Sequence, residues 1–191
     1  ATLLGSLGHH IETAHPGALE EAEFTDRFVT VVSVAIATDL ADWERRLGRT
    51  IADEELEVDN VALRGLGRGV TATEYVGTVN WLHAWTRRVA AWWADDRFDL
   101  LLSPVLNGPP PPIGWLRDPE HGLARLGSLM QYTSQWNMTG QPAVSLPLHH
   151  TTGGLPVGVQ LVAGAGREDL LVRVAAQVES AAPWADRHPA V

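Results

Sequence analysis

A short, nearly continuous apolar run, Phe98-Asp-Leu-Leu-Leu-Ser103, constrains the fold most, and Pro104 closes it. Such a run is typical of a strand that is buried on both faces of a sheet. Two further runs, 142–147 and 156–162, are predicted to be strands joined by a turn around Gly153-Gly154, as in a hairpin. Strands of this kind need helices on their faces, so the sequence predicts an α/β fold with a sheet flanked by helices.

Helical patterns fill most of the remaining chain. We predict helices over 19–47, from Asp53 as N-cap into the glycine-rich segment 65–69, from Thr71 through Trp93, over 123–135, and from Arg167 to a stop before Pro183. The third of these helices has the clearest start signal, because Thr71 and Glu74 can form a capping box there. Its tryptophans are predicted to pack and not to bind a cofactor. Residues 7–15 are predicted to form a short strand, and 136–142 an irregular segment.

The charge of the chain argues against several kinds of partner. It has 14 basic and 23 acidic residues, so the net charge is −9. Duplex nucleic acid and anionic membrane surfaces both need a basic face. No apolar run approaches the ~20 residues of a membrane helix, and the chain does not start like a signal peptide. We therefore predict no nucleic acid and no membrane as partners, and a cytoplasmic location.

The chain also lacks two residue types that carry much enzyme chemistry. Cysteine is absent, and all 14 basic residues are arginine. Thiolate metal sites, cysteine nucleophiles and a lysine base are therefore excluded. The eight histidines form no i,i+4 pair, and adjacent ones in a strand point to opposite faces, so we predict no metal site and no cofactor. Neither Ser103 nor Ser145 lies in a Gly-x-Ser-x-Gly elbow, which argues against a self-contained esterase.

Five ordered motifs over residues 98–184 resemble the C-terminal part of the amidase signature family. They are Phe98-Asp-Leu-Leu-Leu-Ser-Pro104, the Pro-rich loop ending Pro-Pro-Ile-Gly114, Asn137-Met-Thr-Gly-Gln-Pro-Ala143, Gly154-Leu-Pro-Val-Gly-Val-Gln-Leu-Val162 and Glu168-Asp-Leu-Leu171. The helical stretch 19–95 resembles the segment that precedes them in the family. Within the family, the tryptophan-rich, lysine-free style is similar to amidases related to the aminohexanoate cyclic-dimer (nylon-oligomer) hydrolases.

The resemblance implies hydrolysis of a carboxamide through an acyl-enzyme. In the family a serine attacks the carbonyl, a second serine relays its proton, and a lysine is the base. These groups belong to the family's N-terminal half, and this chain has no adjacent serine pair and no lysine. Arginine, with a pKa above ~12, stays protonated and cannot replace the base. The resemblance therefore implies that residues 1–191 are the C-terminal part of an amidase domain, one α/β unit of a mixed-sheet fold without catalytic residues, inactive alone.

The resemblance also implies that this half supplies strands and one wall of the substrate pocket. Tyr132, Trp136 and Asn137 precede the Gly-Gln-Pro turn, while Ile113 and Trp115 follow the Pro-rich loop and could line the pocket mouth. The alternative is that Trp136 belongs to the core and Asn137 pins the turn through backbone hydrogen bonds. The expected partners are a small-molecule amide and the N-terminal part of the same amidase, or a second copy of the chain.

Two other functions stay open at this point. One is a non-catalytic assembly or binding subunit that borrowed the fold. The other is the amidase subunit of a tRNA-dependent amidotransferase, for which the acidic charge makes tRNA contact less natural. Gln160, in an apolar strand, is predicted to be a buried structural hydrogen-bonding residue.

Overall fold

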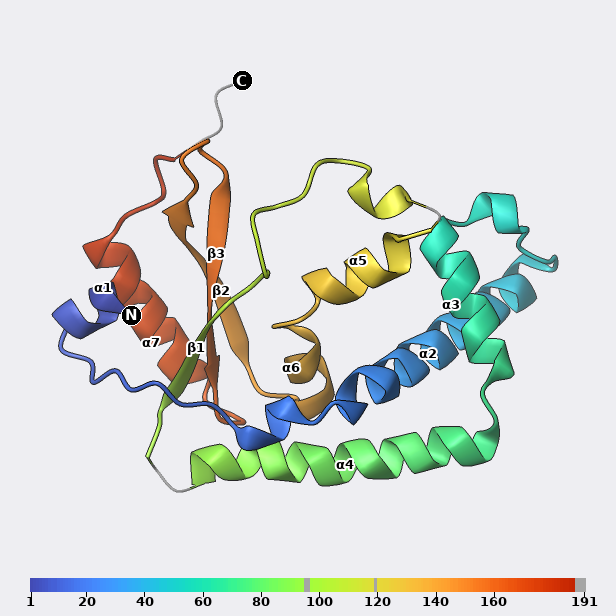
Figure 1. Ribbon diagram of the computed structural model, residues 1–191, viewed down its shortest axis with the longest axis horizontal. Helices are drawn as coiled ribbons and strands as arrows, with labels where there is room; N and C mark the ends of the chain where they lie inside the picture. The colour runs from blue at the N-terminus through green and yellow to red at the C-terminus, as the bar shows by residue number, and fades with distance from the viewer. Residues whose placement is uncertain (95–96, 119, 188–191) are drawn as a thin grey trace. The chain divides into compact units, whose positions relative to one another are not determined.

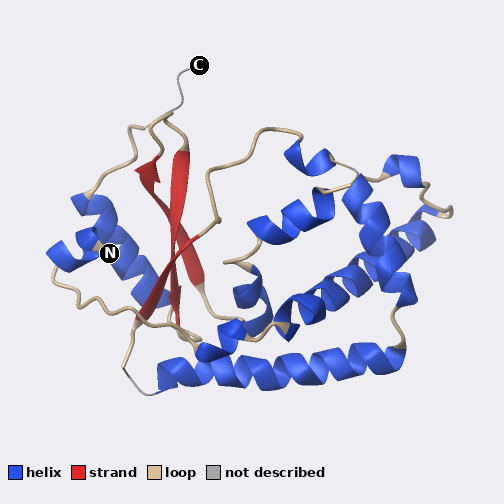
Figure 2. Cartoon of the chain, in the orientation of Figure 1, coloured by secondary structure: helices blue, strands red, loops and turns tan. Residues whose placement is uncertain are grey.

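The computed structural model describes residues 1–94, 97–118 and 120–187 (Figures 1 and 2). They fall into two compact units, each described by itself below. The sheet unit comprises Ala1–Gly17, Arg88–Pro110 and Leu129–Val191, and the helical unit comprises Ala18–Arg87 and Pro111–Ser128. The single domain expected from the sequence stays a prediction.

Three strands form the sheet of the sheet unit: β1 (Leu100–Pro104), β2 (Ala143–His150) and β3 (Pro156–Ala163). Their order is β1-β3-β2 and both pairs are antiparallel, so β3 lies in the middle of the sheet. Ser103 of β1 and Ser145 of β2 both pair with Gln160 of β3. The three predicted strands and the hairpin are therefore confirmed, and so is the α/β class.

Helices α1 (Thr2–Ser6) and α7 (Glu168–Ala181) pack with the sheet around the apolar core of this unit (Figure 1). Acidic residues in the first turn of α7 complement the positive end of its dipole. The helix predicted from Arg167 is thus confirmed. The buried residues of this core come from all of these elements: Leu4, Leu146, Leu161, Ala163, Leu171, Val174 and Val178.

The strand predicted over 7–15 is wrong. Leu4 instead lies in α1 and is buried, and Leu3 and Leu7 pack against the same core. Gly8, with a φ of 92°, carries the chain away from the helix in the left-handed region. The residues that follow are mostly polar, and Ile11 is 44% exposed, so a strand there would bury little apolar surface.

The helical unit is organised by α2 (Glu23–Leu47) and α3 (Val58–Gly69), which lie side by side (Figure 1). The α2 helix ends as predicted, because Gly48 takes the left-handed conformation of a C-cap. Gly67 of α3 meets Ser33 of α2, which is 1% exposed. A methyl group at Gly67 would lie 2.0 Å from the Ser33 carbonyl oxygen. The glycine-rich segment therefore forms the last turns of α3, which ends at Gly69 as predicted, and within it Gly67 is a close-packing site.

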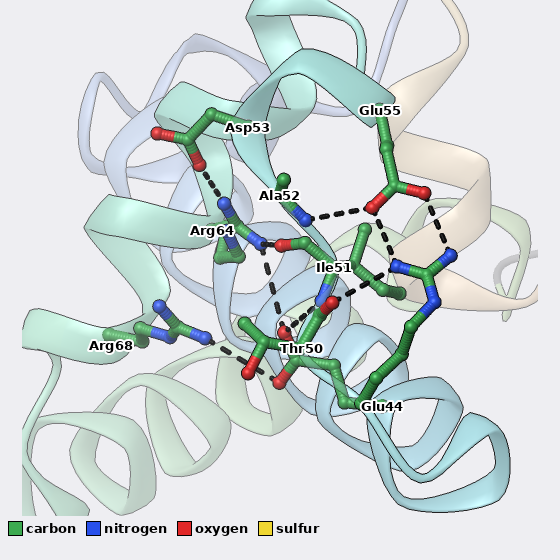
Figure 3. A network of polar contacts seen from close by, with 9 residues as sticks. Glu44, Thr50, Ile51, Ala52, Asp53, Glu55, Arg64 and Arg68 are labelled. Atoms are coloured by element: carbon green, nitrogen blue, oxygen red, sulfur yellow. Dashed lines mark hydrogen bonds and ion pairs between the residues drawn. The ribbon is translucent and has the colours of Figure 1, made fainter.

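A network of polar contacts joins the end of α2, the short 3-10 helix η2 (Asp53–Glu55) and α3 (Figure 3). The side chain of Arg64 is 7% exposed and is its centre. It donates to the Ile51 carbonyl oxygen at 2.9 Å and pairs with the Asp53 carboxylate, while Glu44 lies 4.0 Å away. The prediction that Asp53 is the N-cap of this helix is therefore wrong. The helix α3 begins only at Val58, and Asp53 is an ion-pair partner of Arg64 instead.

Glu55 connects Arg49 and Ala52 within this network. Its carboxylate accepts two hydrogen bonds from the Arg49 guanidinium, at 2.7 and 2.8 Å, and one from the Ala52 backbone N–H at 3.0 Å. The hydrogen bond from Arg49, then that from Ala52, lower the pKa of Glu55 to about 2. Glu55 is therefore charged at neutral pH and keeps the turn between α2 and α3 bonded.

The helix α4 (Ala72–Ala94) begins with the predicted capping box. The Glu74 N–H donates to the Thr71 hydroxyl at 3.2 Å, and the Thr71 N–H donates to the Glu74 carboxylate at 2.8 Å. These bonds to Thr71 lower the pKa of Glu74. Trp85 is 0% exposed, stacks on Phe24 at 4.4 Å and donates its indole N–H to Ala18. The predicted packing role of this tryptophan is confirmed.

None of the helices in the described part of the chain combines the length and the apolar character that crossing a bilayer requires.

Candidate functional site

The five residues predicted to bind substrate fall in the two different units. Tyr132, Trp136 and Asn137 belong to the sheet unit, and Ile113 and Trp115 to the helical unit. Within the sheet unit the structure brings the first three together around one short helix.

This short helix, α6 (Ser134–Thr139), replaces the irregular segment predicted over 136–142. The helix predicted over 123–135 is correspondingly shorter and is α5 (Gly122–Leu129). A tight turn separates the two, in which the Ser134 N–H donates to the Met130 carbonyl at 3.1 Å. Gly140, with a φ of 75°, ends α6 in the left-handed conformation. The sequence pattern missed this break because apolar and polar residues continue across it with a helical period.

The carbonyl oxygen of Tyr132 accepts hydrogen bonds from two side chains and so connects the residues of the site. It accepts the Trp136 indole N–H at 2.9 Å and the Gln160 side-chain N–H at 2.8 Å. The same Gln160 amide nitrogen also donates to the Ser103 hydroxyl at 3.0 Å. Gln160 is 5% exposed, so the predicted buried structural hydrogen-bonding residue is confirmed. It fixes the turn before α6 to the middle of the sheet.

Trp136 and Asn137 differ in what they offer to a ligand. Trp136 is 7% exposed and lies edge-on to Trp93, with ring centroids 6.2 Å apart. Asn137 is exposed, and within the described ranges its carboxamide makes no hydrogen bond, so it does not pin the turn as the alternative supposed. An exposed carboxamide can donate to and accept from an amide ligand. The role of both residues in substrate binding stays a prediction.

Ile113 and Trp115 sit differently in the helical unit. Ile113 is fully exposed at the end of the Pro-rich loop, so in this structure it packs against nothing. Trp115 lies under the guanidinium of Arg125, 5.0 Å from the ring centroid, and its carbonyl accepts a hydrogen bond from that arginine at 2.6 Å. A fully exposed isoleucine is available for contact with a ligand or with further polypeptide.

The hydrogen-bond partners of the Ser103 hydroxyl lie next to it in the sheet unit. It donates to the Pro104 carbonyl at 3.0 Å and accepts from the Gln160 side-chain N–H at 3.0 Å, and neither of these two groups is a base that could activate it. Among the residues that are described, no three His, Asp or Glu side chains gather where they could hold a metal ion.

Replacing Gln160 with leucine tests its hydrogen bonds. We expect the free energy of unfolding to fall by about 1–3 kcal/mol, because the partly buried Ser103 hydroxyl and the Tyr132 carbonyl each lose a hydrogen bond. Chemical denaturation measures it, with Gln131→Leu as the matched exposed control. An equal stability of the two variants would contradict the role given to Gln160.

Sequence reasoning missed a cavity of about 550 Å³ in the sheet unit. Trp93 and Phe98 line it together with Gln141, which is 6% exposed. Gln160 lies inside a predicted apolar strand, whereas Gln141 lies in the Gly-Gln-Pro turn, where no residue pattern predicts a buried side chain. In the described part of the chain, only the three-dimensional contacts show that the Gln160 side chain is hydrogen-bonded while Gln141 Oε1 is buried without a partner.

Known proteins that are similar to this chain are amide hydrolases with the same α/β arrangement. The family model described as Amidase matches residues 1–172. The 6-aminohexanoate-cyclic-dimer hydrolase of Pseudomonas sp. (strain NK87) is 35% identical over 99% of this chain and 40% of that protein. The hydrolase of the same name from Paenarthrobacter ureafaciens is 34% identical over the same shares. A solved structure of 6-aminohexanoate cyclic dimer hydrolase superposes with a TM-score of 0.88 at 33% identity, covering 98% of this chain and 41% of the other.

The chain belongs to the amidase signature family. The fold and family expected from the sequence are thereby confirmed, including the likeness to the cyclic-dimer hydrolases. The chain spans about 40% of the length of the curated relatives named above.

Proposed function

We propose that this chain is the C-terminal portion of a serine amidase that hydrolyses carboxamide bonds through an acyl-enzyme. Two observations taken together support the proposal. The family model matches residues 1–172, and the chain has no lysine and no adjacent serine pair. The nucleophile and base that the family resemblance implies must then come from other polypeptide. The chain contributes strands and part of the substrate pocket.

The open edges of the sheet support a polypeptide partner. In the described part of the chain, β1 and β2 each pair on one side only. Unpaired strand edges favour the addition of further strands. The partner we propose is the N-terminal part of the same amidase, and a second copy of this chain is the alternative. The cytoplasmic location expected from the sequence stays a prediction.

For the substrate we propose a linear or cyclic aliphatic amide. The relatives that match along nearly the whole chain are named for the 6-aminohexanoate cyclic dimer. Asn137, exposed and unbonded among the described residues, and Ile113, fully exposed, are the side chains that we propose contact such a ligand.

The activity of the chain alone tests the proposal. We expect the purified 191-residue chain to show no turnover of 6-aminohexanoate cyclic dimer or of simple aliphatic amides, measured as amine release. A chimera in which residues 1–191 replace the matching part of the Pseudomonas relative is expected to hydrolyse the cyclic dimer. Turnover by the isolated chain would overturn the proposal, and a folded but inactive chimera would favour a non-catalytic subunit.

A further inference from the structure

One asparagine of the chain is followed by glycine, and this dipeptide, Asn107-Gly108, lies in a bend shortly after β1. The sequence contains four asparagines, and the other three precede valine, tryptophan or methionine. Both residues of the dipeptide are exposed. Neither the amidase reaction nor the substrate contacts proposed for this chain involve these two residues.

The backbone nitrogen of Gly108 is open to reaction. Its N–H donates no hydrogen bond to any described residue, whereas the N–H that follows Asn60 donates to the Glu57 carbonyl in α3 at 3.1 Å. Asn80 and Asn137 lie inside α4 and α6, where helical hydrogen bonds hold the backbone. Glycine also has no Cβ that could block the approach of the preceding side chain. Of the four asparagines, Asn107 therefore has the most accessible neighbouring nitrogen.

We propose that Asn107 is a site of self-modification, at which the chain deamidates without an enzyme. The Gly108 nitrogen attacks the side-chain carbonyl carbon of Asn107, so that a C–N bond forms and the bond to the side-chain nitrogen breaks. The attacking nitrogen gives its proton to solvent, and the leaving group takes up a proton and departs as ammonia. Water then opens the cyclic succinimide at either of its two carbonyls, which gives aspartate or isoaspartate.

The reaction changes the loop in two ways. It adds a negative charge to a chain whose net charge is already −9. Isoaspartate also routes the main chain through the former side chain, which lengthens the backbone by a CH₂ group. The change falls between β1 and the fully exposed Ile113. Any contact that this loop makes with further polypeptide would then change with the age of the protein.

Incubation of the purified 191-residue chain in mildly alkaline buffer tests the proposal. We expect the mass at residue 107 to rise by about 1 Da, because an NH₂ group is replaced by OH. In H₂¹⁸O the product should take up heavy oxygen from the water that opens the ring. The rate should rise with pH, because the attacking nitrogen must lose its proton. Peptide mass spectrometry with electron-transfer fragmentation locates the change and separates aspartate from isoaspartate.

Gly108→Ala is the matched control, because the structure has room for it. A Cβ at Gly108 meets no atom within 4 Å, and Gly108 is not among the glycines with a positive φ. We expect this variant to fold and to deamidate at least about tenfold more slowly, since the new methyl group hinders the attack. Equal rates in the two chains, or reaction mainly at another asparagine, would overturn the proposal. So would a folded chain that does not react while the urea-unfolded chain does, because the fold would then protect the site.

Discussion

Replacing Gly67 with alanine is expected to destabilise the chain by about 3 kcal/mol or more. The new methyl group would lie 2.0 Å from the Ser33 carbonyl oxygen and 2.5 Å from its carbonyl carbon. These are backbone atoms of α2, so no side-chain rotation relieves the overlap, and α2 and α3 must move apart. The urea concentration at the midpoint of unfolding, followed by circular dichroism, measures the loss.

Gly65→Ala is the matched control in the same helix. A Cβ at Gly65 meets no atom within 4 Å. Alanine is favoured over glycine inside a helix, so the free energy of unfolding of this variant should rise by up to about 1 kcal/mol. If Gly67→Ala proved as stable as Gly65→Ala, the close packing of α2 on α3 would be wrong.

Replacing Arg64 with methionine is expected to cost about 2–4 kcal/mol, close to the cost of breaking a buried ion pair. The guanidinium ties the Ile51 carbonyl and Asp53 to α3, and its side chain is only 7% exposed. Methionine fills much of the volume but leaves the partly buried Ile51 carbonyl oxygen without its hydrogen bond from Arg64. Asp53 is 63% exposed, so water replaces its partner and keeps the cost below the upper end for such pairs.

Arg68→Met separates the buried charge from the exposed one. Arg68 is one helical turn further along α3, lies 3.9 Å from Glu44 and has a side chain that is 57% exposed. Surface ion pairs contribute about 0–1 kcal/mol, so this variant should unfold almost at the midpoint of the unaltered chain. Equal losses in the two variants, measured by the same denaturation, would show that Arg64 is not the centre of the network.

The strands and long helices could be predicted because their signals are local. The capping box of Thr71 and Glu74 and the left-handed Gly48 depend on residues within one helical turn. The role of Gly67 within the glycine-rich segment 65–69 could not be predicted in this way, because it depends on contact with Ser33, which is far away in the sequence. The same holds for Asp53, whose partner Arg64 lies on the next helix.

The candidate site was predictable only in part. A resemblance to the family located Tyr132, Trp136 and Asn137 near one turn, and the structure gathers them there. Their bonding could not be anticipated, since the Tyr132 carbonyl receives Gln160 from a strand 28 positions later. The lack of a partner for Gln141 Oε1 among the described residues is likewise a property of the folded contacts and could not be predicted from the sequence.

The position of β3 in the middle of the sheet has a consequence for the order of folding. Its pairing with β2 closes a short local loop, whereas Ser103 of β1 must find Gln160 across 57 positions. Closing the longer loop costs more chain entropy and is slower. We therefore expect the hairpin of β2 and β3 to form first in this unit, and β1 to pair with β3 afterwards.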